Sequence, residues 1–247
     1  MKKAARPTRL VVPIYNEAGL VDALAGVAKE AATRFPELKL VFVDDGSRDG
    51  SGELLRRALP STSSVEIQIL RQNGGKGHAI RHGFRGAPEE RLIFMDGDLA
   101  YSLDHIPALL EALETYDVVI GSRAMAPQAQ GGLPARRVFL GWGFNRLACF
   151  ILGLDYPDTQ AGLKGFSRQA AESLFSRQKL AGFAFDVELL YLCRKLGFRV
   201  GQVPAQVSSE HSYKTSHIKL ICNSLSCFFE LWLIRWWSWT GAYRLSR

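Results

Sequence analysis

The sequence lacks the features of disulfide-bonded and secreted proteins. Its 247 residues contain only four cysteines, with no CxxC pair, and these lie in apolar or helical surroundings. Buried thiols of this kind favour a reducing compartment. The basic N-terminal residues lead directly into Pro7 and an expected strand, without a long apolar stretch. We therefore predict no secretory signal peptide and a cytoplasmic core domain.

Motifs for two other classes of site are incomplete. Residues 74–77 are rich in glycine, but the GxxxxGK[ST] spacing of NTP-hydrolysing loops is absent. His78 and His82 are four residues apart, as zinc ligands can be, yet no third ligand accompanies them. We interpret them as surface or cleft histidines, so neither an NTPase nor a zinc enzyme is favoured.

The composition and periodicity indicate an α/β protein with an anionic partner. With 47% hydrophobic and 22% charged residues, the chain can bury one full core. Short apolar strands alternate with amphipathic helices between residues 10 and 120, which predicts a mostly parallel central sheet with right-handed crossovers. The formal net charge of +7 suits phosphates, an acidic membrane surface or nucleic acid, and charge alone does not choose among them.

Polar clusters follow three of the expected strands, at residues 15–17, 44–45 and 96–98. In open α/β sheets, ligands bind beyond the carboxyl ends of the strands. In an extended segment Asp96 and Asp98 would point the same way, and two adjacent carboxylates favour a divalent cation that bridges to a diphosphate. The alternative is an ordinary Asp-Gly-Asp turn. The clusters thus predict a metal-dependent enzyme acting on a nucleotide diphosphate compound.

Five motifs occur in the order and spacing of the family 2 inverting glycosyltransferases of the GT-A fold. They are PIYNE (13–17), VDDGSRDG (43–50), NGGKGHA (73–79), DGD (96–98) and GSR (121–123). Within that family, residues 98–102, 158–166 and 183–190 most resemble dolichyl-phosphate glucosyltransferases and bacterial polyprenyl-phosphate relatives. The mannose synthases are similar but slightly more distant. The resemblance covers residues 9 to about 215 and implies a GT-A domain, which is an α/β fold with a mostly parallel sheet.

The resemblance implies a site for a nucleotide sugar. The nucleoside would be held by Pro13, Tyr15, Glu17, Val43 and Asp45. Of these, the Asp45 carboxylate would accept a hydrogen bond from the base or the ribose. Lys76 lies at an expected helix N-terminus, which we place near the donor.

The same resemblance implies a metal. Asp96 and Gly97 would face the donor, and Asp96 and Asp98 would be ligands to Mg2+ or Mn2+. The metal would screen the leaving diphosphate as the glycosidic bond breaks. Mannose synthases have a further ligand two residues after the second aspartate, where this chain has Ala100. Phosphate, water or another side chain must then complete the metal shell.

The nature of the acceptor decides whether a base is needed. The second pKa of a phosphate monoester lies near ~6, so a polyprenyl phosphate is already a charged nucleophile at neutral pH. The resemblance assigns phosphate contacts to Arg123 and Lys214, while Ser208 stands where mannose synthases have an arginine. Three other basic residues could substitute for that arginine: Arg136, Arg137 and Lys164.

A hydroxyl acceptor would instead require a general base. Asp186 occupies roughly the position of the base in hydroxyl-directed members of the family. Alternatively, Asp186 and Glu188 are a pair of solvated acids at a helix N-terminus, where the helix dipole favours them. A third hypothesis is a non-catalytic, membrane-associated protein that binds sugar nucleotides at a degenerate site. Its only support is Ala100 and Ser208.

The last part of the chain is apolar and rich in tryptophan. Trp232, Trp236, Trp237 and Trp239 lie within eight positions. A helix over residues 225–239 would extend about 22 Å at ~1.5 Å per residue, less than the ~30 Å hydrocarbon core of a bilayer. We predict a helix that lies in the membrane interface. The alternative is a helix docked on the domain core or in a dimer interface.

Together these interpretations give one prediction. Residues 1–215 form the GT-A domain, and residues 216–247 form a membrane-interface or interaction segment. The enzyme transfers a hexose with inversion from a nucleotide sugar, UDP-glucose first and GDP-mannose second, to polyprenyl or dolichyl phosphate. It acts as a peripheral protein on the cytoplasmic face of a membrane. A membrane-protein partner or a homo-oligomer stays open, and no nucleic-acid partner is expected.

Overall fold

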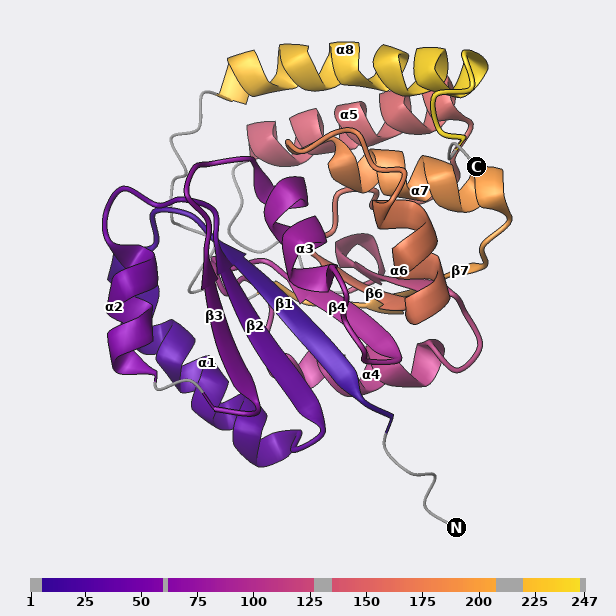
Figure 1. The fold of residues 1–247 in the computed structure, drawn as a ribbon. Helices are drawn as coiled ribbons and strands as arrows, with labels where there is room; N and C mark the ends of the chain where they lie inside the picture. Colours follow the sequence, from indigo (N-terminus) through magenta and orange to yellow (C-terminus); the bar gives the residue numbers. More distant parts are fainter. Residues whose placement is uncertain (1–5, 60–61, 127–134, 208–219, 245–247) are drawn as a thin grey trace.

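The protein is built on a seven-stranded sheet with helices on both faces (Figure 1). The structure, a computed structural model, describes residues 6–59, 62–126, 135–207 and 220–244. The strands are β1 (Thr8–Ile14), β2 (Leu38–Asp44), β3 (Val65–Ile69), β4 (Arg91–Met95), β5 (Val118–Ser122), β6 (Leu163–Ser167) and β7 (Val200–Pro204). The α-helices are α1 (Val21–Arg34), α2 (Ser51–Ala58), α3 (Lys76–Phe84), α4 (Ile106–Ala112), α5 (Ala135–Leu152), α6 (Arg168–Phe175), α7 (Phe185–Leu196) and α8 (Leu220–Trp239). Short 3-10 helices are η1 (Ala18–Leu20), η2 (Leu103–His105) and η3 (Arg123–Met125).

The strand order is β3-β2-β1-β4-β6-β5-β7. All neighbouring strands are parallel except β6, which runs antiparallel to both β4 and β5. The predicted α/β fold with a mostly parallel sheet is therefore confirmed. Because parallel strands end at the same edge, the polar clusters that follow β1, β2 and β4 lie along one edge of the sheet.

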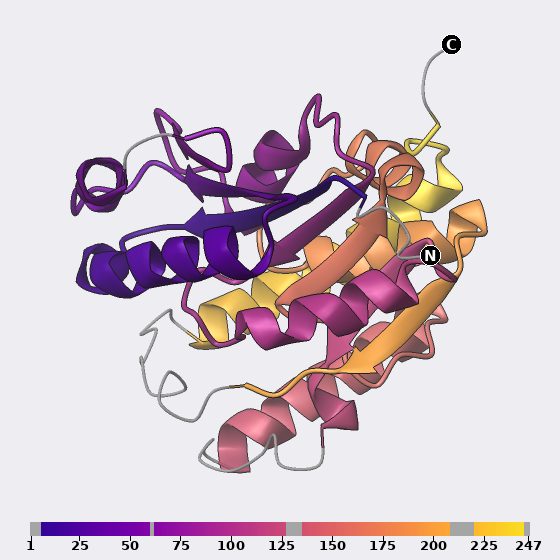
Figure 2. The same cartoon turned by 90° about the horizontal axis from the view of Figure 1, so that it is seen from below.

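Alternating residues of each strand feed two cores. Leu10 and Val12 of β1 belong to the core beneath α1, α2 and α4, whereas Val11 belongs to the core beneath α3, α5, α6 and α7. This period of two is expected for a strand that is covered on both faces. Seen from below, α1 and α4 lie in front of the sheet and α8 lies behind it (Figure 2).

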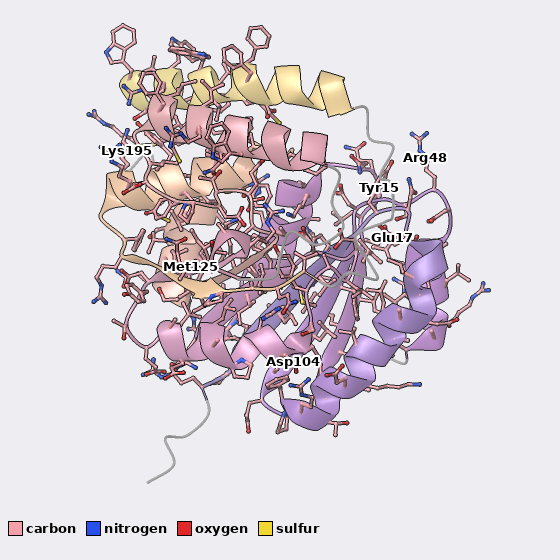
Figure 3. All side chains as sticks on the ribbon, turned by 180° about the vertical axis from the view of Figure 1, so that it is seen from behind. Tyr15, Glu17, Arg48, Asp104, Met125 and Lys195 are labelled. Carbon is pink, nitrogen blue, oxygen red and sulfur yellow. The ribbon has the colours of Figure 1, made fainter. Side chains whose placement is uncertain are left out.

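The tryptophan-rich helix α8 packs on the protein with one face only. It contacts α5 and α7, and Cys227, Leu231 and Ile234 on its inner face are buried. Within the described ranges, no helix is both long enough and apolar enough to cross a membrane. The docked arrangement, which the sequence analysis gave as the alternative, is therefore present. The outer face of α8 stays exposed, with Trp236 at 55% and Trp239 at 86%, and aromatic rings stand on that side in Figure 3.

Candidate active site

The two acidic residues after β4 lie in different surroundings. The strand ends before Asp96, whose amide donates to the Gly162 carbonyl at 2.9 Å, and Leu99 has a positive φ of 59°. The Asp96 side chain is 28% exposed, whereas Asp98 is exposed and its Oδ1 accepts from the Ala100 amide at 3.0 Å. The extended segment expected here is therefore absent, because the chain turns as soon as the strand ends.

Lys76, the first residue of α3, connects Asp96 to the interior. Its Nζ lies 2.7 Å from Asp96 Oδ1 and 3.5 Å from Asp186 Oδ2, and 5.5 Å from the ring centroids of Phe94 and Phe185. Burial on its own lowers the pKa of Lys76, but the two carboxylates outweigh burial and raise that pKa above its ordinary value. Lys76 is thus a fixed cation at the edge of the sheet, with 19% of its side chain exposed.

Behind Lys76, Asp186 and Lys164 form a buried ion pair. Lys164 Nζ donates to Asp186 Oδ1 and to the Ala161 carbonyl, both at 2.6 Å, and the Lys164 and Asp186 side chains are 0% and 3% exposed. Burial lowers the pKa of the Lys164 ammonium, and Asp186 opposes this shift. Two expectations are therefore wrong: Asp186 is not a solvated acid, and Lys164 is not free to bind an acceptor phosphate. A hydroxyl could reach Asp186 only by breaking these pairs.

Asp45 holds the glycine loop that precedes α3. Its Oδ1 accepts from the Gly74 amide at 3.0 Å and its Oδ2 from the Gly75 amide at 2.7 Å, and its side chain is 4% exposed. Gly75 has a φ of +94°, and a Cβ there would lie 2.5 Å from the Ala181 carbonyl oxygen, so only glycine fits. The predicted contact of Asp45 with base or ribose would have to share these oxygens with the two amides. In this structure Asp45 positions Lys76.

The other residues predicted to hold the nucleoside differ in exposure. Tyr15 is 42% exposed and lies with Glu17 at the edge of the molecule next to α2 (Figure 3). Pro13 is half-buried, and its carbonyl oxygen occupies the position that a Cβ on Gly97 would need. Val43 is fully buried in the core, and its contact with the nucleoside stays a prediction.

Arg123, at the end of β5, is anchored by Asp158. Its Nε and Nη2 each donate to the Asp158 carboxylate at 2.8 Å, and its backbone amide donates at 3.0 Å. Although burial favours the neutral acid, the hydrogen bonds from Arg123 hold the pKa of Asp158 below its ordinary value. The Arg123 side chain remains 43% exposed. The fixed guanidinium can therefore present its free side to an anion.

Comparison with known proteins identifies the family. Residues 10–175 match Glycosyl transferase family 2. The chain belongs to this family. The glycosyltransferase AglD of Haloferax volcanii is 28% identical over 243 residues, which is 96% of this chain. Dolichyl-phosphate beta-glucosyltransferase ALG5C of Trichomonas vaginalis is 30% identical over 213 residues, which is 81% of this chain. The chain spans 38% and 63% of the lengths of these two relatives.

Further comparisons agree on family and fold. Polyprenol monophosphomannose synthase of Mycolicibacterium smegmatis is 30% identical over 210 residues, covering 81% of this chain and 77% of that protein. Glucosyl-3-phosphoglycerate synthase from Mycobacterium tuberculosis, solved with Mn2+, UDP and phosphoglyceric acid, has a TM-score of 0.67 at 19% identity, covering 93% of this chain and 79% of that one. The predicted resemblance to dolichyl- and polyprenyl-phosphate sugar transferases of the GT-A fold is confirmed.

The acidic residues of this family 2 member suit a divalent ion that takes few protein ligands. Burial, reinforced by the charge of Asp98, raises the pKa of Asp96, although Lys76 opposes the shift. The two carboxylates are therefore close enough to repel each other. Asp96 Oδ1 is buried and accepts no aligned hydrogen bond. In the part of the chain that the structure describes, no group of three His, Cys, Asp or Glu side chains could hold a metal. Asp96 and Asp98 together offer two carboxylates, and Mg2+ is commonly bound by one or two carboxylates with substrate phosphates and water.

Some predicted residues cannot be placed, and the structure adds others. Lys214 and Ser208 lie outside the described residues, as do the side chains of Arg136 and Arg137. Gly162 is a residue that the sequence analysis did not assign: a Cβ there would overlap Asp96 Oδ2. Sequence pattern gave no signal for this role, because it depends on β6 lying beside β4.

Proposed function

We propose that this chain transfers a hexose from a nucleotide sugar to polyprenyl or dolichyl phosphate, with inversion and with a divalent cation. UDP-glucose is the first choice of donor and GDP-mannose the second. The observation that carries the proposal is the burial and ion pairing of Asp186, which is 2% exposed and paired with two lysines. A hydroxyl acceptor needs a free base at that position, whereas an ionised phosphate needs none. The alternative of a hydroxyl-directed enzyme is disfavoured for this reason.

The names of the relatives point to the same class of acceptor. One relative is a dolichyl-phosphate beta-glucosyltransferase and another a polyprenol monophosphomannose synthase. An undecaprenyl-phosphate mannosyltransferase of Micrococcus luteus also matches this chain. The structural neighbour in complex with UDP and Mn2+ supports a nucleotide-sugar donor and a metal. These names support the proposed substrate class, and the site geometry supports the proposed roles of individual residues.

In the proposed reaction, carboxylates bind the metal and cationic side chains bind the phosphates. Asp98, with Asp96, would hold Mg2+ or Mn2+, which when bound stabilises the negative charge of the leaving diphosphate. Lys76 is fixed beside Asp96 and orients the donor phosphates. Arg123 holds the acceptor phosphate, whose oxygen attacks the anomeric carbon as the bond to the diphosphate breaks. Attack opposite to the leaving group inverts the anomeric configuration.

We further propose that the outer face of α8 rests on the cytoplasmic surface of a membrane, as a peripheral contact. The exposed residues of this face are Phe229, Trp232, Leu233, Trp236 and Trp239. Tryptophan is favoured at the interface between water and lipid, and a one-sided apolar face on a docked helix suits contact along a membrane rather than insertion across it. An acceptor that is insoluble in water would be reached from this position.

Transfer is tested with radiolabelled donors. Purified protein is incubated with UDP-glucose or GDP-mannose, undecaprenyl phosphate and Mn2+, and label is counted in solvent-extractable lipid. We expect labelled lipid, lost on chelation and reduced at least about 100-fold in Asp98→Ala. Asp22→Ala is the matched control. It removes an exposed carboxylate that lies on α1 and should leave transfer unchanged. No labelled lipid with either donor, together with labelling of a hydroxyl acceptor, would reject the proposal.

Membrane contact is tested by flotation with phosphatidylglycerol vesicles. The protein should float with the vesicles, and Trp236→Ser combined with Trp239→Ser should weaken this binding. Leu54→Ser is the control, because Leu54 is 41% exposed on α2, which covers the opposite face of the sheet. If the tryptophan variants and the control float like the unmodified protein, α8 does not contact the membrane.

A further inference from the structure

We infer that Glu188 is a positioning residue that connects the C-terminal segment after α8, which contains Tyr243, to the loop at residues 179–182, which packs against the start of α3 next to Lys76. Glu188 lies on α7 and is fully buried. The inference rests on the proposed function for its kinetic readout, and it has a second readout that is independent of activity.

Glu188 binds two separate parts of the chain. Its carboxylate accepts from the Lys179 amide at 3.0 and 3.1 Å and from the Leu180 amide at 2.9 Å. The same carboxylate accepts from the Tyr243 hydroxyl at 2.8 Å. Tyr243 follows α8 and is 4% exposed. One buried carboxylate thus joins the loop at residues 179–182 to the C-terminal segment, and a buried acceptor that loses a donor is left unsatisfied at a cost.

The loop bound by Glu188 packs against the start of α3. The Ala181 carbonyl oxygen accepts from the Gly77 amide at 2.8 Å and lies 2.5 Å from the position that a Cβ on Gly75 would take. The Gln178 carbonyl accepts from Arg81 Nη1 at 3.2 Å, one turn further along α3. Lys76 lies between Gly75 and Gly77, which both adjoin Ala181. On this inference, a shift of the loop would move Lys76 Nζ relative to Asp96.

The end of α8 contacts the same loop through the side chain of Trp237. Lys179 Nζ lies 5.9 Å from the ring centroid of Trp237, and the Trp237 and Tyr243 rings pack edge to face at 6.3 Å. A cation over an aromatic face adds to the backbone contacts. A continuous set of contacts therefore runs from α8 through Glu188 to the donor site. Loosening the segment after α8 should misplace Lys76 even though that segment is remote from the donor.

The chain offers a matched control for this test. Tyr191 Oη donates to Ser238 Oγ at 2.6 Å near the end of α8, so Tyr191→Phe also removes one hydroxyl contact with the C-terminal part of the chain but none of the hydrogen bonds to Glu188. We would compare Tyr243→Phe and Glu188→Gln with Tyr191→Phe. Thermal melts followed by circular dichroism identify variants that remain folded at the assay temperature. Tyr243→Phe keeps the ring and its packing, which makes the test independent of whether Glu188→Gln folds.

The first readout is hydrogen exchange followed by mass spectrometry on peptides covering residues 74–80. We expect exchange there to rise about 3- to 10-fold in Tyr243→Phe and Glu188→Gln and to stay unchanged in Tyr191→Phe. The second is steady-state transfer of glucose from UDP-glucose to undecaprenyl phosphate. The KM for UDP-glucose should rise about 3- to 10-fold in the first two variants, with the KM for the lipid within about twofold of the unmodified value.

The outcomes separate this inference from the proposed function. If the unmodified protein transfers no sugar, the proposed function fails, and hydrogen exchange still decides the role of Glu188. Unchanged exchange in Tyr243→Phe and Glu188→Gln overturns the inference. An equal rise of hydrogen exchange in Tyr191→Phe also overturns the inference, because the effect would then come from general loosening of the C-terminal part of the chain.

Discussion

Replacing Asp186 by asparagine should destabilise the protein without removing a catalytic base. The Asp186 and Lys164 side chains are 3% and 0% exposed, and their charged atoms are 2.6 Å apart. Removing one partner of a buried ion pair costs about 3–5 kcal/mol, because the other charge is left without compensation. Loss of the proton from Lys164, whose pKa burial already lowers, limits this cost.

The expected effect is large enough to measure by thermal denaturation. For a chain of 247 residues, each kcal/mol shifts Tm by about 2–4 °C, so Asp186→Asn should melt about 6–20 °C lower. Adding Lys164→Met removes the stranded cation and should recover at least about half of the loss, since apolar replacement of a whole buried pair is often close to neutral. A double-mutant cycle from the two single variants and the double variant gives the coupling energy.

The same variant separates the two possible acceptor chemistries. The 2.7 Å contact between Lys76 and Asp96 does not involve Asp186, so we expect it to persist in Asp186→Asn, and transfer measured well below the lowered Tm should fall by less than about tenfold. Loss of a general base would instead lower turnover by about 10^2- to 10^4-fold and remove the basic group from the pH profile. An unchanged Tm together with such a loss would refute the buried-pair reasoning and show that Asp186 meets the acceptor.

Three further predictions follow from single contacts. Gly162→Ala should lower transfer at least about tenfold, measured with the lipid assay, because the new methyl group overlaps Asp96 Oδ2; unchanged activity would contradict this geometry. Burial raises the pKa of the Cys193 thiol to about 12, so at pH 8 iodoacetamide should modify the half-buried Cys149 well before Cys193, as seen by peptide mass spectrometry. The pKa of Asp158 is lowered in the folded protein, so its contribution to stability is present above the ordinary carboxyl pKa of about 4 and is lost as pH falls through the lowered value. Urea unfolding should therefore show Asp158→Asn less stable than the unmodified protein at pH 7 and converging with it in strong acid; a constant difference would exclude this origin.

Local sequence determined the elements that carry the site. The alternation of apolar strands and amphipathic helices places β1, β2 and β4 in one parallel sheet, because each period is fixed by residues a few positions apart. The polar motifs after these strands then fall at one edge without any knowledge of packing. Tyr15, Asp96 and Asp98 were located in this way.

Tertiary packing decided which charges are free. β6 was not predicted as a strand, because Lys164 and Gly165 interrupt its apolar pattern. Its insertion between β4 and β5 places Lys164 against Asp186, 22 positions away, so that a candidate base becomes half of a buried pair. Asp45 likewise accepts hydrogen bonds from amides that are 29 and 30 positions away in the sequence. Asp158 accepts from Arg123, which is 35 positions away.

The C-terminal helix shows the same division. The tryptophan content of α8 indicated an interface but did not say whether protein or membrane covers it. Packing on α5 and α7 covered the face of Leu231 and Ile234 and left the face of Trp236 and Trp239 exposed. Sequence fixes which side chains are apolar or charged, since that is a property of each residue. Which of them meet is set by contacts between segments distant in the chain, and no local pattern encodes those contacts.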